Sequence, residues 1–333
     1  LSEGVKAADY TLQVGFFGRL VSGPVARFNQ LTEDLSLRST LAQTASGLRR
    51  FARGFIKKVL IADILGQTTA QMAALPGEHL STASAWTGIL FFTLQLYYDF
   101  SGYTDMALGL GEVFGIRLPE NFNFPYISSS IGEFWRRWHM SFSTWFRDYI
   151  FFPLERSKNL KPFWRQEYSV LAVFLLTGLW HGFTAGFVLW GLLHGLTILM
   201  ENNFLNKIRQ GWFKPLRHTI TLLVIVTGWV FFLEPTLPGA VEYLGAMFVP
   251  RAAAAPAPMT MLTPIGGLTW LAFGAGIIFS LPVGEWLRKA IPPFPALVEA
   301  VGILMDVNLL SLFVFSVAVQ LEATYMSFIY GGF

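Results

Sequence analysis

Long uncharged windows limit this chain to one kind of environment. Residues 183–200 and 262–281 contain no Asp, Glu, Lys or Arg, and an α-helix needs about 20 predominantly apolar residues to cross the hydrocarbon of a bilayer. Charged residues make up 14% of the chain, against roughly one quarter in an ordinary soluble domain. Backbone polar groups find no water in hydrocarbon, so such windows fold as helices. We therefore expect an all-α, polytopic membrane protein.

Gly and Pro shorten or interrupt several apolar segments. The first segment holds three glycines, a proline and two arginines, so we expect a re-entrant or broken helix that lines a cavity. No internal repeat is visible, which counts against the transporters that are built from repeats. We expect one membrane-embedded domain over residues 1–333. Its candidate membrane segments are residues 14–28, 55–75, 86–110, 168–180, 183–200, 219–233, 262–281 and 298–330.

The charge of the chain indicates membrane lipids rather than nucleic acid as its surroundings. The net charge is only +3, so a nucleic-acid partner is not implied. Basic residues cluster in residues 49–58, 156–165 and 207–217, as expected of cytoplasmic loops or segments at the headgroups. Cysteine is absent, which excludes disulfides, thiolate metal sites and a cysteine nucleophile.

Residues 133–150 have the pattern of one amphipathic helix that lies in the membrane interface. At 100° per residue, an aromatic face spans an arc of about 120° and a polar face that is rich in arginine lies opposite. Such a helix sinks its aromatic side into the acyl boundary and keeps its arginines at water or phosphate. His139 lies at the inner edge of the aromatic face. The members of that face are Trp135, Trp138, His139, Phe142, Trp145, Phe146 and Tyr149.

A second histidine stands inside apolar chain. His181 follows Trp180 in GLWHG, and Gly182 directly after it predicts a helix end or break, with His194 deeper in the next helix. The two histidines would lie about 220° apart on one helix, so they would not share a face. A two-histidine metal site on a helix needs i, i+4 spacing, so we predict no metal site.

A titratable ring at membrane depth is costly and usually marks a pathway or a reaction. His181 either ties helices together through its ring nitrogens or acts as a general base that takes a proton from a hydroxyl, which suggests acyl transfer to an alcohol. His139 either anchors its helix or supports the same site. His194 is interpreted as structural, and His79 and His218 as solvated histidines without partners.

Two carboxylates, Asp99 and Asp105, also fall inside an apolar segment. At membrane depth they need partners or a cavity. Arg136, Arg137 and Arg147 are the candidate partners, and backbone amides of a broken helix are the alternative. A purely structural pairing is at least as well supported as a catalytic role.

An ordered set of motifs resembles the membrane-bound O-acyltransferases. These motifs are YYDFSGYTDMALGLGEVFGIRLPENFNFPYISSSIGEFWRRWHMSFSTWFRDYIFFPL at residues 97–154, GLWHG at 178–182 and GWVFFLEPTLPGAVEYLGAMF at 228–248. Within that superfamily the chain is similar to the bacterial membrane subunits of alginate and peptidoglycan O-acetylation, and more distantly to the teichoic-acid D-alanyl transfer protein. Family members usually carry further membrane helices before this segment, so we expect the chain to lack some N-terminal helices.

The resemblance implies a multi-helix bundle with broken and interfacial helices around a tunnel. His181 corresponds to the signature histidine of the family and His139 to its second histidine. The donor would be a cytoplasmic thioester, either acetyl-CoA or an acyl carrier, with no permanently bound cofactor. A separate extracytoplasmic acetyltransferase would be the partner, and the bacterial cytoplasmic (inner) membrane the location. Candidates for shaping the site are Trp180, Asn121, Asn123 and Arg136.

Other functions stay open at this point. D-alanyl transfer and acyl transfer to a lipid are alternatives within the same chemistry. A transporter or export scaffold, in which Asp99, Asp105 and His181 move protons or an activated sugar, is the alternative from another class. A proton wire away from any tunnel would favour transport, whereas a tunnel that narrows at His181 would favour the enzyme.

Overall fold

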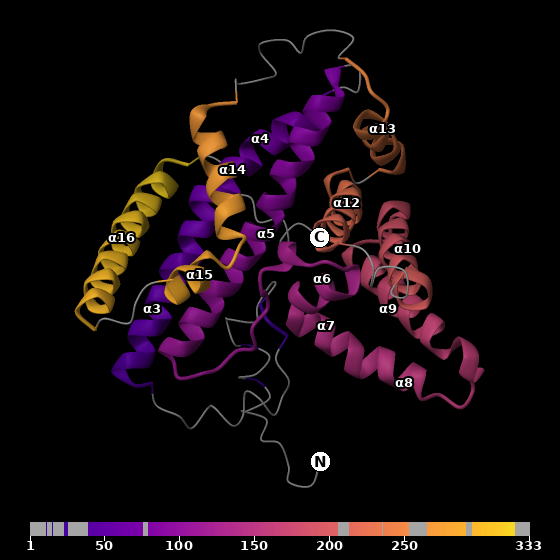
Figure 1. Cartoon of the computed structure of the whole chain (residues 1–333), viewed down its shortest axis with the longest axis horizontal. Helices are drawn as coiled ribbons and strands as arrows, with labels where there is room; N and C mark the ends of the chain where they lie inside the picture. The colour runs from indigo at the N-terminus through magenta and orange to yellow at the C-terminus, as the bar shows by residue number, and fades with distance from the viewer. Residues whose placement is uncertain are drawn as a thin grey trace. The chain divides into compact units, whose positions relative to one another are not determined.

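Every regular element in the described part of the chain is a helix (Figure 1). The computed structural model describes residues 39–75, 79–205, 213–234, 236–252, 265–290 and 295–323, together with residues 11, 15 and 23–25. No strand occurs in these ranges, which confirms the expected all-α class. Contacts divide the chain into two compact units, Leu1–Ile64, Leu96–Phe122 and Pro282–Gly332 in the first, and Leu65–Gln95 and Asn123–Leu281 in the second.

The first unit is built on a close antiparallel pair of helices. Gly47 and Gly54 of α3 face Gly109 and Gly102 of α5, and a Cβ on Gly47 or Gly54 would meet a carbonyl oxygen at 2.5 Å. Glycine is required there because any side chain would separate the two backbones. Phe313 of α16 packs edge-on against Phe55, with ring centroids 5.4 Å apart. The helices of this unit are α3 (Leu41–Ile56), η2 (Lys57–Asp63), the later part of α5 (Thr82–Val113), α15 (Val283–Ala290) and α16 (Pro295–Glu322).

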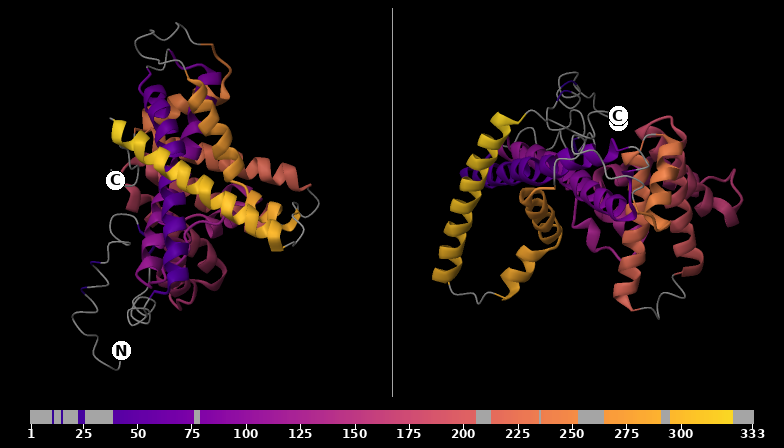
Figure 2. Two further views of the ribbon diagram at one scale, coloured as in Figure 1. Left: turned by 90° about the vertical axis from the view of Figure 1, so that its left-hand side faces the viewer. Right: turned by 90° about the horizontal axis from the view of Figure 1, so that it is seen from above.

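The second unit contains both histidine motifs. Its α9 and α10 form a helical hairpin, seen side by side in Figures 1 and 2. Gly178 and Gly191 allow the close approach, since a Cβ on either would lie within 2.5 Å of a carbonyl oxygen of the other helix. The helices are α4 (Ile64–Ala73), the start of α5, η4 (Pro125–Ile127), α6 (Ile131–Arg137), α7 (Met140–Phe146), η5 (Arg147–Phe151), α8 (Phe152–Glu155), η6 (Pro162–Trp164), α9 (Arg165–His181), α10 (Ala185–Met200), η7 (Glu201–Leu205), α12 (Lys214–Leu233), α13 (Leu237–Phe248) and α14 (Gly267–Phe279).

Short hydroxyl side chains begin several of these helices. The Thr40, Ser130, Thr184 and Thr236 side chains each accept a hydrogen bond from a backbone N–H in the first turn of the following helix. Such caps satisfy donors that have no partner inside the helix. The sequence therefore sets the starting points of α3, α6, α10 and α13 locally.

Two described helices are long and apolar enough to cross a membrane, Lys214–Leu233 and Val298–Glu322, and Gly267–Phe279 is a shorter apolar helix. In Val298–Glu322 only 6% of the most apolar window is buried, so most of its apolar side chains are exposed. Exposed Leu, Val and Phe side chains along α16 suit contact with lipid. Most of the predicted broken segment at 14–28 lies outside the described residues.

The prediction of one amphipathic helix over residues 133–150 is wrong. The chain leaves helical geometry at Trp138 and His139, so that α6 ends at Arg137 and α7 begins at Met140. His139 has φ 44° and ψ 53°, the left-handed conformation. Because of the break, the predicted aromatic face is divided: Trp138 is buried, whereas Trp145 and Tyr149 are exposed.

Candidate active site

His181 is the last residue of α9, as the glycine after it predicts. Three aromatic rings surround its imidazole. Phe232 of α12 is nearest, with centroids 4.9 Å apart, and Trp190 and Phe187 of α10 lie at 5.7 and 6.0 Å. The ring therefore lies where α9, α10 and α12 meet, against three apolar rings, and is itself only partly exposed.

His139 lies close to His181 in the same unit. Its ring stacks on Phe142, with centroids 4.8 Å apart and an interplanar angle of 11°, and Phe142 in turn lies 6.0 Å from Trp180. The two imidazoles are near enough to interact electrostatically. Trp180 itself is 72% exposed. The structure thus brings together three of the residues that the sequence nominated, His139, Trp180 and His181.

Hydrogen bonds to the segment around Asn123 hold the chain just before His139. The N–H of Asn123 donates to the carbonyl of Arg137 at 2.9 Å, and the Arg137 guanidinium donates to the carbonyl of Asn123 and to Glu133. Partial burial alone would raise the pKa of Glu133, but hydrogen bonds from Ser129 and Arg137 outweigh it and leave that pKa below the usual 4.5. Asn123 therefore contributes its backbone to this region.

The start of α6 is fixed to two other helices. The Glu201 carboxylate, 70 residues away in η7, accepts hydrogen bonds from the N–H groups of Ile131 and Gly132. His218 of α12 hydrogen-bonds through Nδ1 to the carbonyl of Ser128 at 2.9 Å. The expectation of a solvated His218 without a partner is therefore wrong, because the residue lies on α12 rather than in a loop.

His194 is completely buried in the middle of α10. Its ring packs edge-on against Trp190 and Trp135, with centroids 5.0 and 5.2 Å apart. Neither ring nitrogen has a hydrogen-bond partner among the described residues. A Cβ on Gly228 of α12 would lie 2.7 Å from its Nε2, so this histidine fills the space between helices, in accord with the structural interpretation.

Asp99, Asp105 and Asn121 belong to the first unit. The prediction that the two carboxylates pair with Arg136, Arg137 or Arg147 is wrong. Asp105 binds Arg50 at 3.0 Å and Lys57 at 2.6 Å, and Asp99 lies 2.9 Å from Lys58, which also pairs with Asp63. The cations sit in α3 and η2, and nothing in the sequence linked those basic residues to α5. Asn121 is buried and donates to Thr104 at 3.4 Å.

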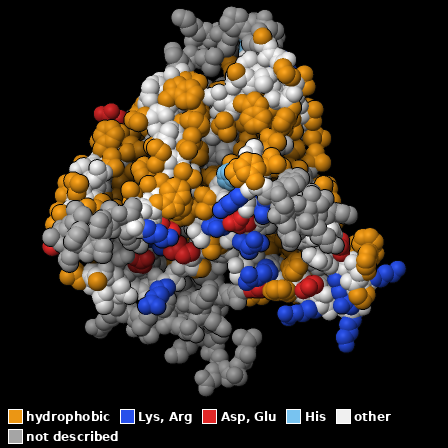
Figure 3. All heavy atoms as spheres, in the orientation of Figure 1, with side chains coloured by type: hydrophobic (Ala, Val, Ile, Leu, Met, Phe, Trp, Pro, Cys, Tyr) orange, Lys and Arg blue, Asp and Glu red, His pale blue; other side chains and the backbone are white. Residues whose placement is uncertain are grey.

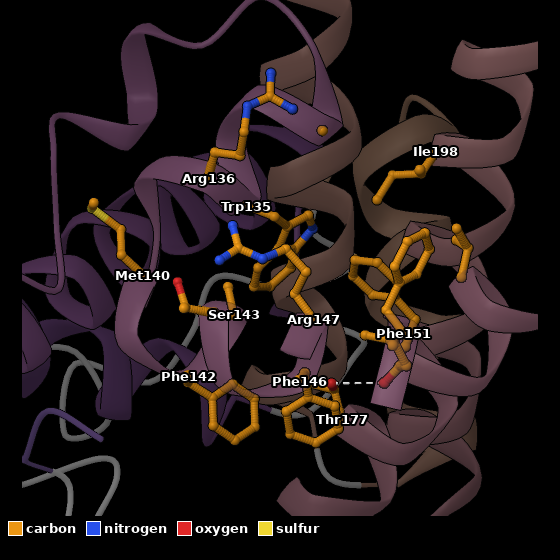
Figure 4. Close-up of a pocket in the computed structure, with 15 residues that line it drawn as sticks. Trp135, Arg136, Met140, Phe142, Ser143, Phe146, Arg147, Phe151, Thr177 and Ile198 are labelled. Carbon is orange, nitrogen blue, oxygen red and sulfur yellow. Dashed lines mark hydrogen bonds between the residues drawn. The ribbon is translucent and has the colours of Figure 1, made fainter. Parts of the chain in front are cut away.

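A pocket of about 510 Å³ lies beside the helix break (Figure 4). Arg136, nominated from the sequence, is on its edge, and Arg147 points into it toward Trp135 and Ser143. The remaining lining is mostly apolar. The lining residues are Gly132, Trp135, Arg136, Met140, Phe142, Ser143, Thr144, Phe146, Arg147, Phe151, Val170, Val173, Phe174, Thr177 and Ile198.

Sequence reasoning missed the residues that enclose His181 and those that hold α6. Phe187, Trp190 and Phe232 fall in ordinary apolar helices, and their shared contact with His181 depends on how three helices pack. A signal did exist for Glu201, because it is the single carboxylate at the end of a long apolar run. Within the described ranges, no group of three or more His, Asp or Glu side chains could hold a metal ion.

Comparison with known proteins identifies what this arrangement is similar to. A sequence model described as "MBOAT, membrane-bound O-acyltransferase family" matches residues 1–237. A probable alginate O-acetylase of Pseudomonas putida is 43% identical over 241 residues, which cover 72% of this chain and 49% of that protein. The chain thus spans about half the length of this relative.

Two further relatives have other acceptors in their names. A peptidoglycan O-acetyltransferase of Helicobacter pylori is 37% identical over 251 residues, 72% of this chain and 46% of the relative. A teichoic acid D-alanyltransferase of Bacillus subtilis is 32% identical over 224 residues, 64% of this chain and 56% of the relative. The relatives therefore share acyl transfer and differ in acyl group and polymer.

Proposed function

Because the chain belongs to the membrane-bound O-acyltransferase family, we propose that it is part of an O-acetyltransferase that acts on an extracytoplasmic polysaccharide. The acetyl group would come from a cytoplasmic thioester, acetyl-CoA or an acyl carrier. Similarity to O-acetylases at 43% and 37% identity, against 32% for a D-alanyltransferase, supports acetyl as the group. The enclosure of His181 beside His139 is the observation that carries the proposal.

In the proposed mechanism His181 is the general base. A ring nitrogen takes the proton of the acceptor hydroxyl as the oxygen attacks the thioester carbonyl carbon. The C–S bond then breaks, and the imidazolium returns the proton to the leaving thiolate. Three aromatic side chains pack against the ring, so its direction is fixed while it holds the proton beside the reacting atoms.

His139 takes a supporting role in this proposal. Its ring is held parallel to Phe142, and its backbone conformation is set by the break between α6 and α7. An imidazole N–H in a fixed direction polarises a carbonyl or orients a hydroxyl without a reorganisation cost during the reaction. Trp180, which lies near Phe142, would shape the approach to the same place.

The test uses the full-length protein in membranes with radiolabelled acetyl-CoA. H181Q, which keeps much of the side-chain volume, should lower acetyl transfer by about 10²- to 10⁴-fold, the usual loss when a general base is removed. H79A, a histidine in a connection between helices, is the matched control and should transfer acetyl at the wild-type rate. Wild-type transfer by H181Q would rule out the general-base role.

We also propose where the protein works and with what. The apolar α12 and α16 support a multi-pass protein of the bacterial inner membrane, and the relatives named for cell-envelope polymers support an acceptor outside the cytoplasm. A separate extracytoplasmic acetyltransferase would receive the acetyl group. Co-purification of such a transferase with the full-length protein would test this partnership. Cells that carry H181Q should also lose acetylation of the polymer.

Proton transport is the competing function, and the ion pairs of the two carboxylates count against it. Asp99 and Asp105 are each held by lysine or arginine at 2.6–3.0 Å. A relay carboxylate has to change partners as protons pass, whereas these ion pairs favour fixed charges. The arrangement therefore supports a structural role for both carboxylates.

A further inference from the structure

The pocket beside the helix break combines an apolar floor with two exposed arginines, Arg136 and Arg147. Arg136 makes no hydrogen bond or ion pair with any described residue. Arg147 uses its Nε for Asp148 at 3.1 Å, which leaves its two terminal nitrogens without a partner in the described part of the chain. The neighbouring Arg137, by contrast, is engaged by Glu133 and Asn123. The pocket thus offers donors that the protein itself does not satisfy.

The rest of the pocket suits a hydrocarbon chain. Its floor is formed by aromatic and branched side chains of α7, η5, α9 and α10, among them Phe146, Phe151, Val170, Val173 and Phe174. Its volume of about 510 Å³ lies within the range of roughly 300–1,000 Å³ that is usual for ligand sites. A small soluble anion would leave this floor empty, so the occupant has an apolar part as well as a negative charge.

The side chains around the pocket are of the kinds that are usual at the level of lipid headgroups. Trp145 and Tyr149, on the same stretch of chain as Arg147, are exposed, as are Phe163 and Trp164 in the connection that leads to α9. Exposed aromatic side chains mixed with basic ones are typical of the membrane–water interface. Figure 3 shows Lys and Arg side chains gathered over α8, next to this region.

From these observations we propose that the pocket is a binding site for an anionic phospholipid. The phosphate accepts hydrogen bonds from Arg147 and Arg136, and one acyl chain lies along the floor. A zwitterionic lipid fits less well because its own cation would come close to two guanidinium groups. Met140 and Phe142 line the pocket and border His139, so a bound lipid would also support the helix break. The proposal concerns binding and is independent of acyl transfer.

The binding test measures the affinity of the purified full-length protein for dioctanoyl-phosphatidylglycerol and dioctanoyl-phosphatidylcholine by titration calorimetry in detergent. The anionic lipid should bind at least tenfold more tightly, because both lipids offer a phosphate but only phosphatidylcholine brings a cation close to the two guanidinium groups. R136Q/R147Q should lose about tenfold in affinity for it. K158Q/K161Q removes two exposed basic residues outside the pocket and should change the affinity less than twofold.

A second pair of variants tests the apolar floor without changing any charge. V173W fills the pocket and should weaken binding of the anionic lipid, whereas L189W, an exposed apolar position on α10 outside the pocket, should not. If R136Q/R147Q does not fold, V173W against L189W decides alone. Equal affinity for the two lipids, an equal loss in K158Q/K161Q, or displacement of the lipid by coenzyme A would overturn the proposal, the last by assigning the pocket to the acyl donor.

Discussion

The imidazole of His139 lies flat on the ring of Phe142, three residues later in the chain, with centroids 4.8 Å apart and planes 11° apart. His139 is outside the helix and Phe142 is inside α7, so the stack fixes an otherwise rotatable side chain to a rigid element. Position matters here because a displacement of about 1 Å in a catalytic group can cost 10²-fold in rate. Phe142 is therefore a positioning residue in the proposed mechanism.

F142L should lower kcat by roughly ten- to hundredfold with little change in KM for the donor, because the variant frees the His139 ring while keeping an apolar side chain in α7. The measurement is steady-state acetyl transfer by the full-length protein. W145L, a change of an exposed aromatic residue in the same helix, serves as the control. A rise in KM with unchanged kcat would show that Phe142 contacts the donor instead.

The left-handed backbone conformation of His139 allows a prediction about the free energy of unfolding. An L-residue in this conformation costs about 1–2 kcal/mol that glycine avoids, so H139G should be more stable than H139A by about 1 kcal/mol. Both variants lack the imidazole and should lower acetyl transfer by the same factor. The free energy of unfolding in detergent separates them.

A matched pair inside a helix should show the opposite order. Thr144 lies in α7, where glycine costs about 0.5–1 kcal/mol relative to alanine, so T144A should be more stable than T144G. If H139A were more stable than H139G, the break between α6 and α7 would not exist in solution.

The break also shows where prediction from sequence ends. Periodicity at 100° per residue assumes a continuous helix, and neither Trp138 nor His139 is a residue that normally interrupts one. The interruption arises from tertiary contacts: Trp138 is buried against Trp229 of α12, with centroids 5.1 Å apart, and the backbone of Arg137 pairs with Asn123. These contacts come from distant parts of the sequence, so a local pattern contains no sign of them.

Features that depend on local chemistry were predicted well. Gly182 indicated the end of α9 at His181, and the uncharged windows indicated an all-helical chain, because both effects act within one element. Partners of the buried carboxylates were not predictable in the same way. Asp99 pairs with Lys58 of η2, and only the close packing of α3 and α5 through glycines brings those segments together.

The lowered pKa of Glu133 predicts how acid affects the stability of this part of the fold. Hydrogen bonds from Ser129 and Arg137 keep its folded-state pKa below 4.5 against the effect of burial. A lowered carboxylate pKa contributes stability that is complete above the unfolded-state pKa and is lost as the pH falls through the folded-state pKa. The melting temperature of E133Q should therefore be lower than that of the wild type at about pH 7, and the difference should shrink below about pH 4.5. A constant difference across this range would mean that the charge of Glu133 is unimportant.

A substitution of Asp99 distinguishes a structural role of this carboxylate from a role in proton transport. The residue is 1% exposed and pairs with Lys58 at 2.9 Å, and removal of one partner of a buried ion pair costs about 3–5 kcal/mol. D99N should therefore lower the free energy of unfolding by about 3 kcal/mol, at the lower end because Asp63 still holds Lys58. Acetyl transfer per folded molecule should stay close to that of the wild type at a temperature where D99N is folded. A proton carrier predicts the reverse, an unchanged free energy of unfolding with loss of activity, because asparagine fills the same space but cannot exchange a proton.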